Sequence, residues 1–134
     1  MRVRNELLIP ILKDAKALIS DESHWIKEYY AGILDPDSGK VDTNIPHDSI
    51  EADCFCTAGA ILRAIQNEAT GASTLDRIKD QQAKAELFMH VEENNPSTPI
   101  YSSVAAYNDS ETTTHADIME LFDKAIARLE EENA

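Results

Sequence analysis

The sequence predicts a mainly helical fold: a small domain of four to five helices with a short β-hairpin or extended arm near residues 25–42. Three observations favour this class. Apolar residues recur at helical spacing in several segments, a turn rich in proline and glycine interrupts them near residue 35, and a length of 134 residues suits one domain. We therefore expect residues 1–134 to form a single domain whose last residues, 130–134, are frayed.

The first helix is expected over residues 5–19, where apolar residues return on one face: Leu8, Leu12, Ala15 and Ile19. Pro10 lies inside this pattern. Because proline lacks the amide N–H that a helix interior needs but is tolerated in the first turn, the regular helix is expected to start around Ile9.

The segment from Trp25 to Asp42 has a different character. Residues 25–31 are rich in strand formers, and residues 35–39 read DPDSG, a turn in which proline fixes φ and glycine permits a positive φ. We expect a short hairpin or an extended arm here. A helix from Trp25 to Ile33 is the competing interpretation.

A central helix is expected from about Ser49 to Ala69, with Asp48 as its cap. Its apolar stripe is wide, which indicates packing on more than one side: Ile50, Cys54, Ala58, Ile61 and Ile65, flanked by Phe55 and Leu62. Cys54 and Cys56 would then point to different faces, so no disulfide is expected between them and the reducing cytoplasm is the expected location.

Two helices are expected in the next part of the chain. Residues 74–93 form one, with a polar first half and a second half that can dock. A shorter helix, capped by Ser102 or Ser103, runs through Tyr107, although residues 101–106 also suit an extended segment.

The last helix has the clearest signals. Thr114 and Asp117 have the spacing of a capping box, with Asp in place of the usual Glu. The helix that follows has one apolar face: Ile118, Leu121, Phe122, Ala125, Ile126 and Leu129. This cap does not explain Asn108 and Asp109, which lie upstream of it, so those two residues either form local turns or take part in a site.

The charge balance narrows the classes of partner. The net charge is −13, from 25 acidic and 12 basic residues. Affinity for phosphate comes largely from Lys and Arg, so direct binding to nucleic acid or to an anionic membrane is not expected. No segment approaches the roughly 20 apolar residues of a membrane span. The remaining interpretations of the negative charge are a basic protein partner, bound cations or solubility alone.

Small residues in the middle of the chain suggest a close contact. Cys56, Gly59 and Ala60 share one helix face, and glycine inside a helix usually serves packing or function. We expect a shallow groove that admits a neighbouring backbone or aromatic ring, with Trp25 and Tyr107 as candidates to fill it. Alternatively, Cys56 is a nucleophile, which requires a lowered pKa and a nearby base.

Metal and cofactor motifs are weak. The chain has neither Cys-x-x-Cys nor His-x-x-x-His spacing, and its glycines are spread singly. Asp35, Asp37 and Gly39 echo a calcium loop, but Lys40 and Pro46 stand where that loop needs its Gly and its terminal Glu. We therefore expect no metal site and no cofactor.

Taken in order, several short motifs resemble a family of short uncharacterised bacterial and phage proteins. They are Trp25, the Ala31…Asp35…Gly39 turn, Asp48…Ala52, Phe55-Cys56-x-x-Gly59-Ala60, Tyr107-Asn108-Asp109 and Asp117-Ile118 before a closing helix. The resemblance covers about residues 25–125, and Tyr107 stands where the family pattern has Trp. It implies no established activity, but it implies that Trp25, Cys56, Asn108 and Asp109 form one spatial cluster.

These observations favour a non-enzymatic interaction or regulatory module whose partner is a protein, and a relationship to phage proteins. A more specific form of this hypothesis is an acidic mimic that occupies the binding site of a nucleic-acid-binding protein. The first alternative is a small thiol-dependent enzyme or ligand-binding protein with a site at Cys56 and Asp109. The second is an oligomeric structural protein that pairs through its last helix. The sequence does not set the oligomeric state. In each case Asn108 and Asp109 are expected to tie the segment before the last helix to the Cys56–Ala60 face.

Overall fold

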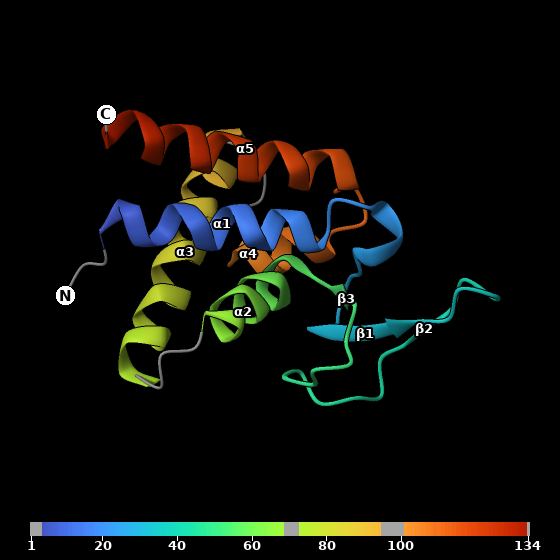
Figure 1. Cartoon of the computed structure of the whole chain (residues 1–134). Coiled ribbons are helices and arrows are strands. Elements are labelled where there is room, and N and C mark those ends of the chain that lie inside the picture. The colour runs from blue at the N-terminus through green and yellow to red at the C-terminus, as the bar shows by residue number, and fades with distance from the viewer. Residues whose placement is uncertain (1–3, 69–72, 95–100, 134) are drawn as a thin grey trace.

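A computed structural model describes residues 4–68, 73–94 and 101–133 of the chain. Within these residues, five α-helices enclose a hydrophobic core and a small sheet lies at one end (Figure 1). The helices are α1 (Asn5–Leu18), α2 (Thr57–Asn67), α3 (Ser73–Asn94), α4 (Val104–Asp109) and α5 (His115–Glu132). The predicted mainly helical class is therefore confirmed.

Helices α1 and α5 lie side by side and antiparallel, while α3 packs against both of them and against α2 (Figure 1). The salt bridge between Lys16 and Asp123, with 2.6 Å between Nζ and Oδ1, joins α1 to α5 at the surface. Beneath it, the predicted apolar face of α5 is buried in full: Ile118, Leu121, Phe122, Ala125, Ile126 and Leu129.

Helix α1 corrects one prediction. It begins at Asn5 rather than near Ile9, and Pro10 lies inside it on the exposed side. The turn that precedes Pro10 is retained because Leu8 is buried in the core, where only 2 % of its surface is exposed. Burial of the first turn therefore outweighs the hydrogen bond that proline cannot donate.

The local capping signals are confirmed. The Thr114 Oγ1 accepts from the Asp117 N–H at 3.2 Å, and the Asp117 carboxylate accepts from the Thr114 N–H at 2.9 Å, which completes the capping box of α5. Ser103 caps α4 by accepting from the Ala106 N–H at 3.1 Å, so this segment is helical rather than extended. Both caps fix where the polypeptide enters a helix.

The sheet has the order β2-β1-β3, with both pairs antiparallel. Its strands are β1 (Ala31–Leu34), β2 (Val41–Asp42) and β3 (Cys54–Phe55). The turn between β1 and β2 contains Gly39 at φ +74°, as the sequence predicts. The hairpin interpretation is therefore confirmed and the helix over residues 25–33 is wrong. A short 3₁₀ turn, η1 (Glu22–His24), precedes this region.

The predicted helix from Ser49 to Ala69 is wrong in its first two turns. Ile50 is 90 % exposed, and Cys54 and Phe55 form β3 by pairing with Gly32 and Ala31 of β1. Helix α2 starts at Thr57, so Asp48 is not its cap; the end at Ala69 lies outside the described residues. Pairing with a distant strand overrode the helical periodicity, because strand propensity depends on partners that the local sequence does not show.

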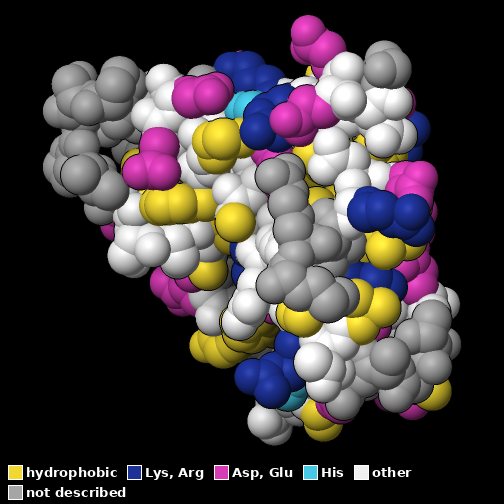
Figure 2. All heavy atoms as spheres, turned by 90° about the vertical axis from the view of Figure 1, so that its left-hand side faces the viewer, with side chains coloured by type: hydrophobic (Ala, Val, Ile, Leu, Met, Phe, Trp, Pro, Cys, Tyr) yellow, Lys and Arg dark blue, Asp and Glu magenta, His cyan; other side chains and the backbone are white. Residues whose placement is uncertain are grey.

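The surface mixes charge types. In Figure 2, acidic, basic and apolar side chains are interspersed over the face that carries the ends of α1 and α5, and the acidic groups form no continuous patch there. None of the described helices combines the length and the apolar character needed to cross a membrane. At the end of α5, Glu130–Glu132 are exposed but still helical, and Ala134 lies outside the described residues.

Candidate functional site

Asn108 is the centre of a buried polar cluster. No part of its surface is exposed (0 %), and its side chain joins the start of α2 to the segment after η1. The Asn108 Oδ1 accepts from the Trp25 Nε1 at 2.7 Å, from the Thr57 N–H at 3.0 Å and from the Thr57 Oγ1 at 2.7 Å. Its Nδ2 donates to the Ile26 carbonyl at 3.1 Å and to the Asp109 Oδ1 at 3.0 Å. Because indole and backbone N–H groups only donate, these partners fix which side-chain atom is the oxygen.

Asp109 holds the backbone of the neighbouring segment. Its Oδ1 accepts from the Glu28 N–H at 2.7 Å. Glu28 has φ +73°, a left-handed conformation that costs a non-glycine residue free energy. Lys27 adds a second tie, since its Nζ donates to the Ser110 carbonyl at 2.7 Å and lies 5.4 Å from the centre of the Trp25 ring. The end of α4 therefore clamps residues 25–28.

Cys56 is the N-cap of α2. Its Sγ accepts from the Gly59 N–H at 3.3 Å, and its side chain is buried. Burial raises the pKa of this thiol, against the smaller opposing effect of the Gly59 and Ala58 N–H groups, and the Asp109 carboxylate raises it further. A raised pKa disfavours the thiolate that a nucleophile needs, and the observed role of the Cys56 Sγ is to accept the Gly59 N–H.

The small-residue face of α2 is filled by backbone. A Cβ on Gly59 would lie 1.8 Å from the Tyr30 carbonyl oxygen, so the chain before β1 passes directly over this glycine. The prediction of a close backbone contact is confirmed, and at Gly59 the neighbour is the Tyr30 backbone rather than the Trp25 or Tyr107 ring that the sequence suggested. The Trp25 indole lies against the His115 ring at 5.9 Å, and Tyr107 packs edge-on against Tyr101 at 5.1 Å. Glycine makes this contact possible, because a residue with a Cβ would collide with the Tyr30 carbonyl.

The predicted site residues are thus only partly brought together. Asn108 is hydrogen-bonded to both Trp25 and Asp109, and Asp109 also binds the backbone of the segment that carries Trp25. Cys56 belongs to the same region as the N-cap of α2. Gly59 and Tyr107 face other neighbours. This arrangement has a complete structural account, and a catalytic role for Cys56 or Asp109 stays a prediction.

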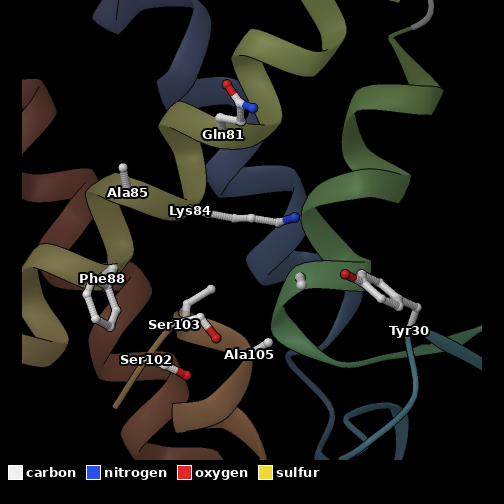
Figure 3. Close-up of a pocket in the computed structure, with 10 residues that line it drawn as sticks. Tyr30, Gln81, Lys84, Ala85, Phe88, Ser102, Ser103 and Ala105 are labelled. Carbon is white, nitrogen blue, oxygen red and sulfur yellow. The ribbon is translucent and has the colours of Figure 1, made fainter. Parts of the chain in front are cut away.

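A pocket of about 370 Å³ opens between α2, α3 and α4, and we call it the α3–α4 pocket. Its lining is mostly apolar, with polar groups from Tyr30, Gln81, Lys84 and two serines. The lining residues are Tyr30, Ala58, Gln81, Lys84, Ala85, Phe88, Ser102, Ser103, Val104 and Ala105. Figure 3 shows the Lys84 side chain extending from α3 into the space between α3 and α2. The Lys84 Nζ pairs with the Asp80 Oδ2 at 2.8 Å, one turn earlier on α3, which leaves the wall without strong net charge. Such a pocket lies within the size range of small binding sites.

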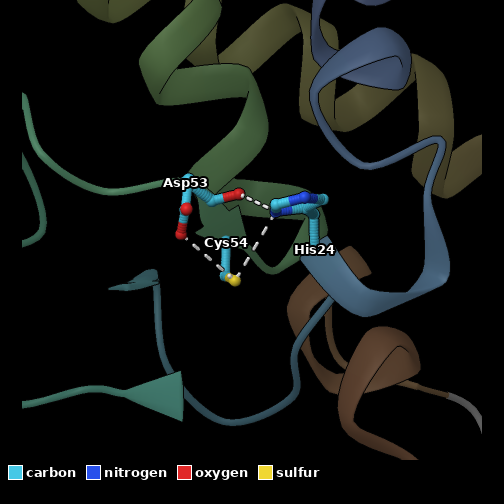
Figure 4. Close-up of side chains that lie close together, drawn as sticks. All are labelled: His24, Asp53 and Cys54. Carbon is cyan, nitrogen blue, oxygen red and sulfur yellow. Dashed lines mark hydrogen bonds between the residues drawn. The ribbon is translucent and has the colours of Figure 1, made fainter. Parts of the chain in front are cut away.

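The sequence did not point to a second group, formed by His24, Asp53 and Cys54 beside β3 (Figure 4). The His24 Nδ1 lies 2.7 Å from the Asp53 carbonyl and 3.8 Å from the Cys54 Sγ. Burial and the Asp53 carboxylate raise the pKa of the Cys54 thiol to about 12. Because 29 residues separate His24 from Asp53 and no motif spans that distance, the only signal was the presence of these residue types. Cys54 and Cys56 are both unpaired thiols, as predicted.

Comparison with known proteins places the chain in a family. The model of DUF6197, a family of unknown function, matches residues 4–128. The chain belongs to this family. Membership in DUF6197 confirms the resemblance to an uncharacterised family, and a bacterial or phage origin stays a prediction. No curated protein and no solved structure matches the chain. For this DUF6197 member, function must therefore be argued from the geometry described above.

Proposed function

We propose that the chain is a non-enzymatic interaction module that receives an apolar side chain of a protein partner in the α3–α4 pocket. The observation that supports this best is the composition of that pocket. Its lining combines small and aromatic residues, among them Tyr30, which is 46 % exposed, and the preceding Tyr29 is 51 % exposed. Exposed tyrosine beside an apolar pocket is typical of residues that contribute most to protein binding.

The polar groups of the pocket suit recognition better than catalysis. The Ser103 Oγ is engaged as the cap of α4, and the Lys84 ammonium is paired with Asp80. None of the pocket residues described is a histidine, cysteine or carboxylate that would activate a serine as a nucleophile. With a net charge of −13, a partner whose surface is basic around the inserted side chain is favoured, and its affinity should fall as salt increases.

Other candidate functions have less support. A thiol-dependent enzyme needs a thiolate, whereas burial raises the pKa of both thiols. An oligomer built through α5 needs an apolar face left open, whereas the apolar face of α5 is buried within the chain. An acidic mimic needs a continuous negative surface, and the face in Figure 2 has mixed charges. We place the interaction module in the cytoplasm on the two unpaired thiols.

A matched pair of substitutions tests the proposal. Ala85→Arg fills the mouth of the pocket, and Ala127→Arg makes the same change on the exposed side of α5. Partners are first recovered on the wild-type protein by affinity capture from a lysate of the source organism and then purified. Direct binding by calorimetry should weaken about tenfold or more for Ala85→Arg, which is ~1.4 kcal/mol, and should not change for Ala127→Arg.

Thermal unfolding of both variants checks that each remains folded, since exposed positions in a helix interior tolerate arginine well. If a purified partner binds both variants as tightly as it binds the wild type, the pocket is not the contact surface. A partner that binds more tightly at high salt would contradict the expected basic surface.

A further inference from the structure

Three different metal-binding groups converge beside β3, away from the α3–α4 pocket. His24 ends η1, while Asp53 and Cys54 are consecutive residues where the chain enters β3. One ligand atom from each, an imidazole nitrogen, a carboxylate oxygen and a thiol sulfur, lies within 4.8 Å of the other two (Figure 4). Neither the family description nor the interaction module assigns a role to this group.

The two separations from the Cys54 sulfur fit a single tetrahedral ion. The Cys54 Sγ lies 3.8 Å from the His24 Nδ1 and 3.5 Å from the Asp53 Oδ1. Zinc binds sulfur at ~2.3 Å and nitrogen at ~2.0 Å, so two such ligands at a tetrahedral angle stand about 3.6 Å apart. The two separations from the Cys54 Sγ therefore match those that a bound ion requires, and the His24 nitrogen and the Asp53 oxygen lie within 4.8 Å of each other.

Backbone hydrogen bonds hold the three ligand residues in place. The Ile26 N–H donates to the Phe55 carbonyl at 3.1 Å, which ties the end of η1 to β3. The Asp53 N–H donates to the Gly32 carbonyl at 3.0 Å, and the Asp53 Oδ1 accepts from the Leu34 N–H at 2.9 Å. A hydrogen bond to a ligating carboxylate is the kind of outer contact that orients metal ligands.

We propose that His24, Asp53 and Cys54 form a binding site for a divalent transition metal ion of the zinc class, with three protein ligands and a fourth position open to water. A thiolate and an imidazole select zinc-like ions over calcium and magnesium, which prefer oxygen ligands only. The site has access to solvent because Asp53 is exposed, although Cys54 is buried. One thiolate and one carboxylate balance the charge of the ion.

Binding changes the protonation of two ligands. The Cys54 thiol, which makes long contacts of 3.5 Å to the Asp53 Oδ1 and 3.6 Å to the Ser23 carbonyl, loses its proton to solvent and binds as thiolate. The His24 Nδ1 gives up its hydrogen bond to the Asp53 carbonyl, and its proton moves to Nε2 through solvent. One proton is released for each ion bound, and no redox partner is involved.

Cobalt and zinc test this site directly. Cobalt(II) added to the metal-free protein should bind 1:1 and give a thiolate-to-cobalt absorption band with the strong visible bands of tetrahedral coordination. Cys54→Ser should abolish the thiolate band, and Cys56→Ser, which removes the other thiol of the chain, should leave it unchanged. Zinc titrations by calorimetry should show affinity at least about tenfold lower for Cys54→Ser than for Cys56→Ser.

Asp53→Asn supplies a second variant, which should keep the fold. Its side-chain oxygen can still accept from the Leu34 N–H, but it lacks the charge of the carboxylate, so zinc affinity should also fall about tenfold or more. Calorimetry in two buffers of different ionisation enthalpy should report one proton released per zinc. Failure of the wild-type protein to bind either ion 1:1, or a thiolate band that persists in Cys54→Ser, would overturn the proposal. Neither result bears on the α3–α4 pocket.

Discussion

Replacement of Asn108 by Ala should be among the most destabilising single changes in the polar interior. The substitution removes the acceptor of the Thr57 N–H and Oγ1, in a residue with 0 % of its surface exposed. A buried donor left without a partner costs about 1–3 kcal/mol, so these two together cost roughly 2–6 kcal/mol. The substitution also leaves the Trp25 Nε1 and the Ile26 carbonyl without their partner. Their loss costs less free energy, because both residues are only half-buried and water can reach them. For a chain of this length, the melting temperature should fall by about 6–18 °C.

A double-mutant cycle with Thr57→Val gives the reasoning its sharpest test. In the wild type, Thr57→Val removes a hydrogen bond from the Asn108 Oδ1 and should cost about 1 kcal/mol. In the Asn108→Ala background it removes an orphaned hydroxyl and should cost nothing or restore stability. The coupling between the two sites should therefore be about 1 kcal/mol or more. Urea unfolding followed by far-UV circular dichroism measures all four proteins without relying on Trp25 fluorescence, which the cluster itself perturbs.

The exposed Asn67→Ala is the control and should change the unfolding free energy by less than about 0.5 kcal/mol. The account of Asn108 is refuted by a loss below about 1 kcal/mol for Asn108→Ala. It is also refuted if the costs of the two substitutions add within about 0.5 kcal/mol, because independent sites behave in that way.

Two further predictions follow from the glycine contact and from the buried thiols. Gly59→Ala should prevent folding or cost more than about 3 kcal/mol, because the new Cβ meets the Tyr30 carbonyl. Gly39→Ala should cost only about 1 kcal/mol, from backbone strain at a positive φ. The yield of soluble protein and the urea midpoint of each variant measure this difference. The pKa of the Cys54 thiol is about 12 in the folded protein and about 9 in the unfolded chain. The neutral buried thiol therefore contributes its full stabilisation of the folded state below pH 9, and this stabilisation is lost between pH 9 and 12. With chelator present, the stability of wild type relative to Cys54→Ser should fall across that window, and an unchanged difference would contradict the raised pKa.

Signals confined to a few neighbouring residues predicted structure well. The capping box at Thr114 and Asp117, the cap at Ser103 and the turn at Gly39 all depend on backbone groups within three or four residues. The apolar face of α5 was likewise predicted in full, because its periodicity is uninterrupted by turn residues. These features are specified by the local sequence whatever the rest of the chain does.

The start of α2 could not be predicted in this way. Ile50 and Cys54 fall at helical spacing with residues of α2, yet Cys54 pairs with Gly32 in a strand. The partner strand lies more than twenty residues away, so the local pattern carries no record of it. The same limit applied to His24, Asp53 and Cys54, which the sheet brings together.

The candidate site was predicted in outline and missed in detail. Asn108 and Asp109 were both expected to reach the α2 region. Asn108 does so through Thr57, whereas Asp109 binds the Glu28 N–H in the segment after η1, and no motif had indicated either partner. Every residue except proline has the same backbone N–H, so the sequence does not show which N–H group a side chain will bind. The raised pKa of Cys56 follows from burial, which becomes known only once the chain is folded.

The side chain of Asn108 also bears on how this polypeptide emerges from the ribosome. Its partners Trp25 and Thr57 lie 83 and 51 residues earlier, so they are synthesised well before it. Until α4 leaves the exit tunnel, the first turn of α2 has a donor pair with no acceptor other than water. Synthesis proceeds at ~5–20 residues per second, so this state lasts for several seconds. A nascent chain arrested before residue 108 should therefore be sensitive to proteases around residues 25–57, and resumed synthesis through α5 should bring protection.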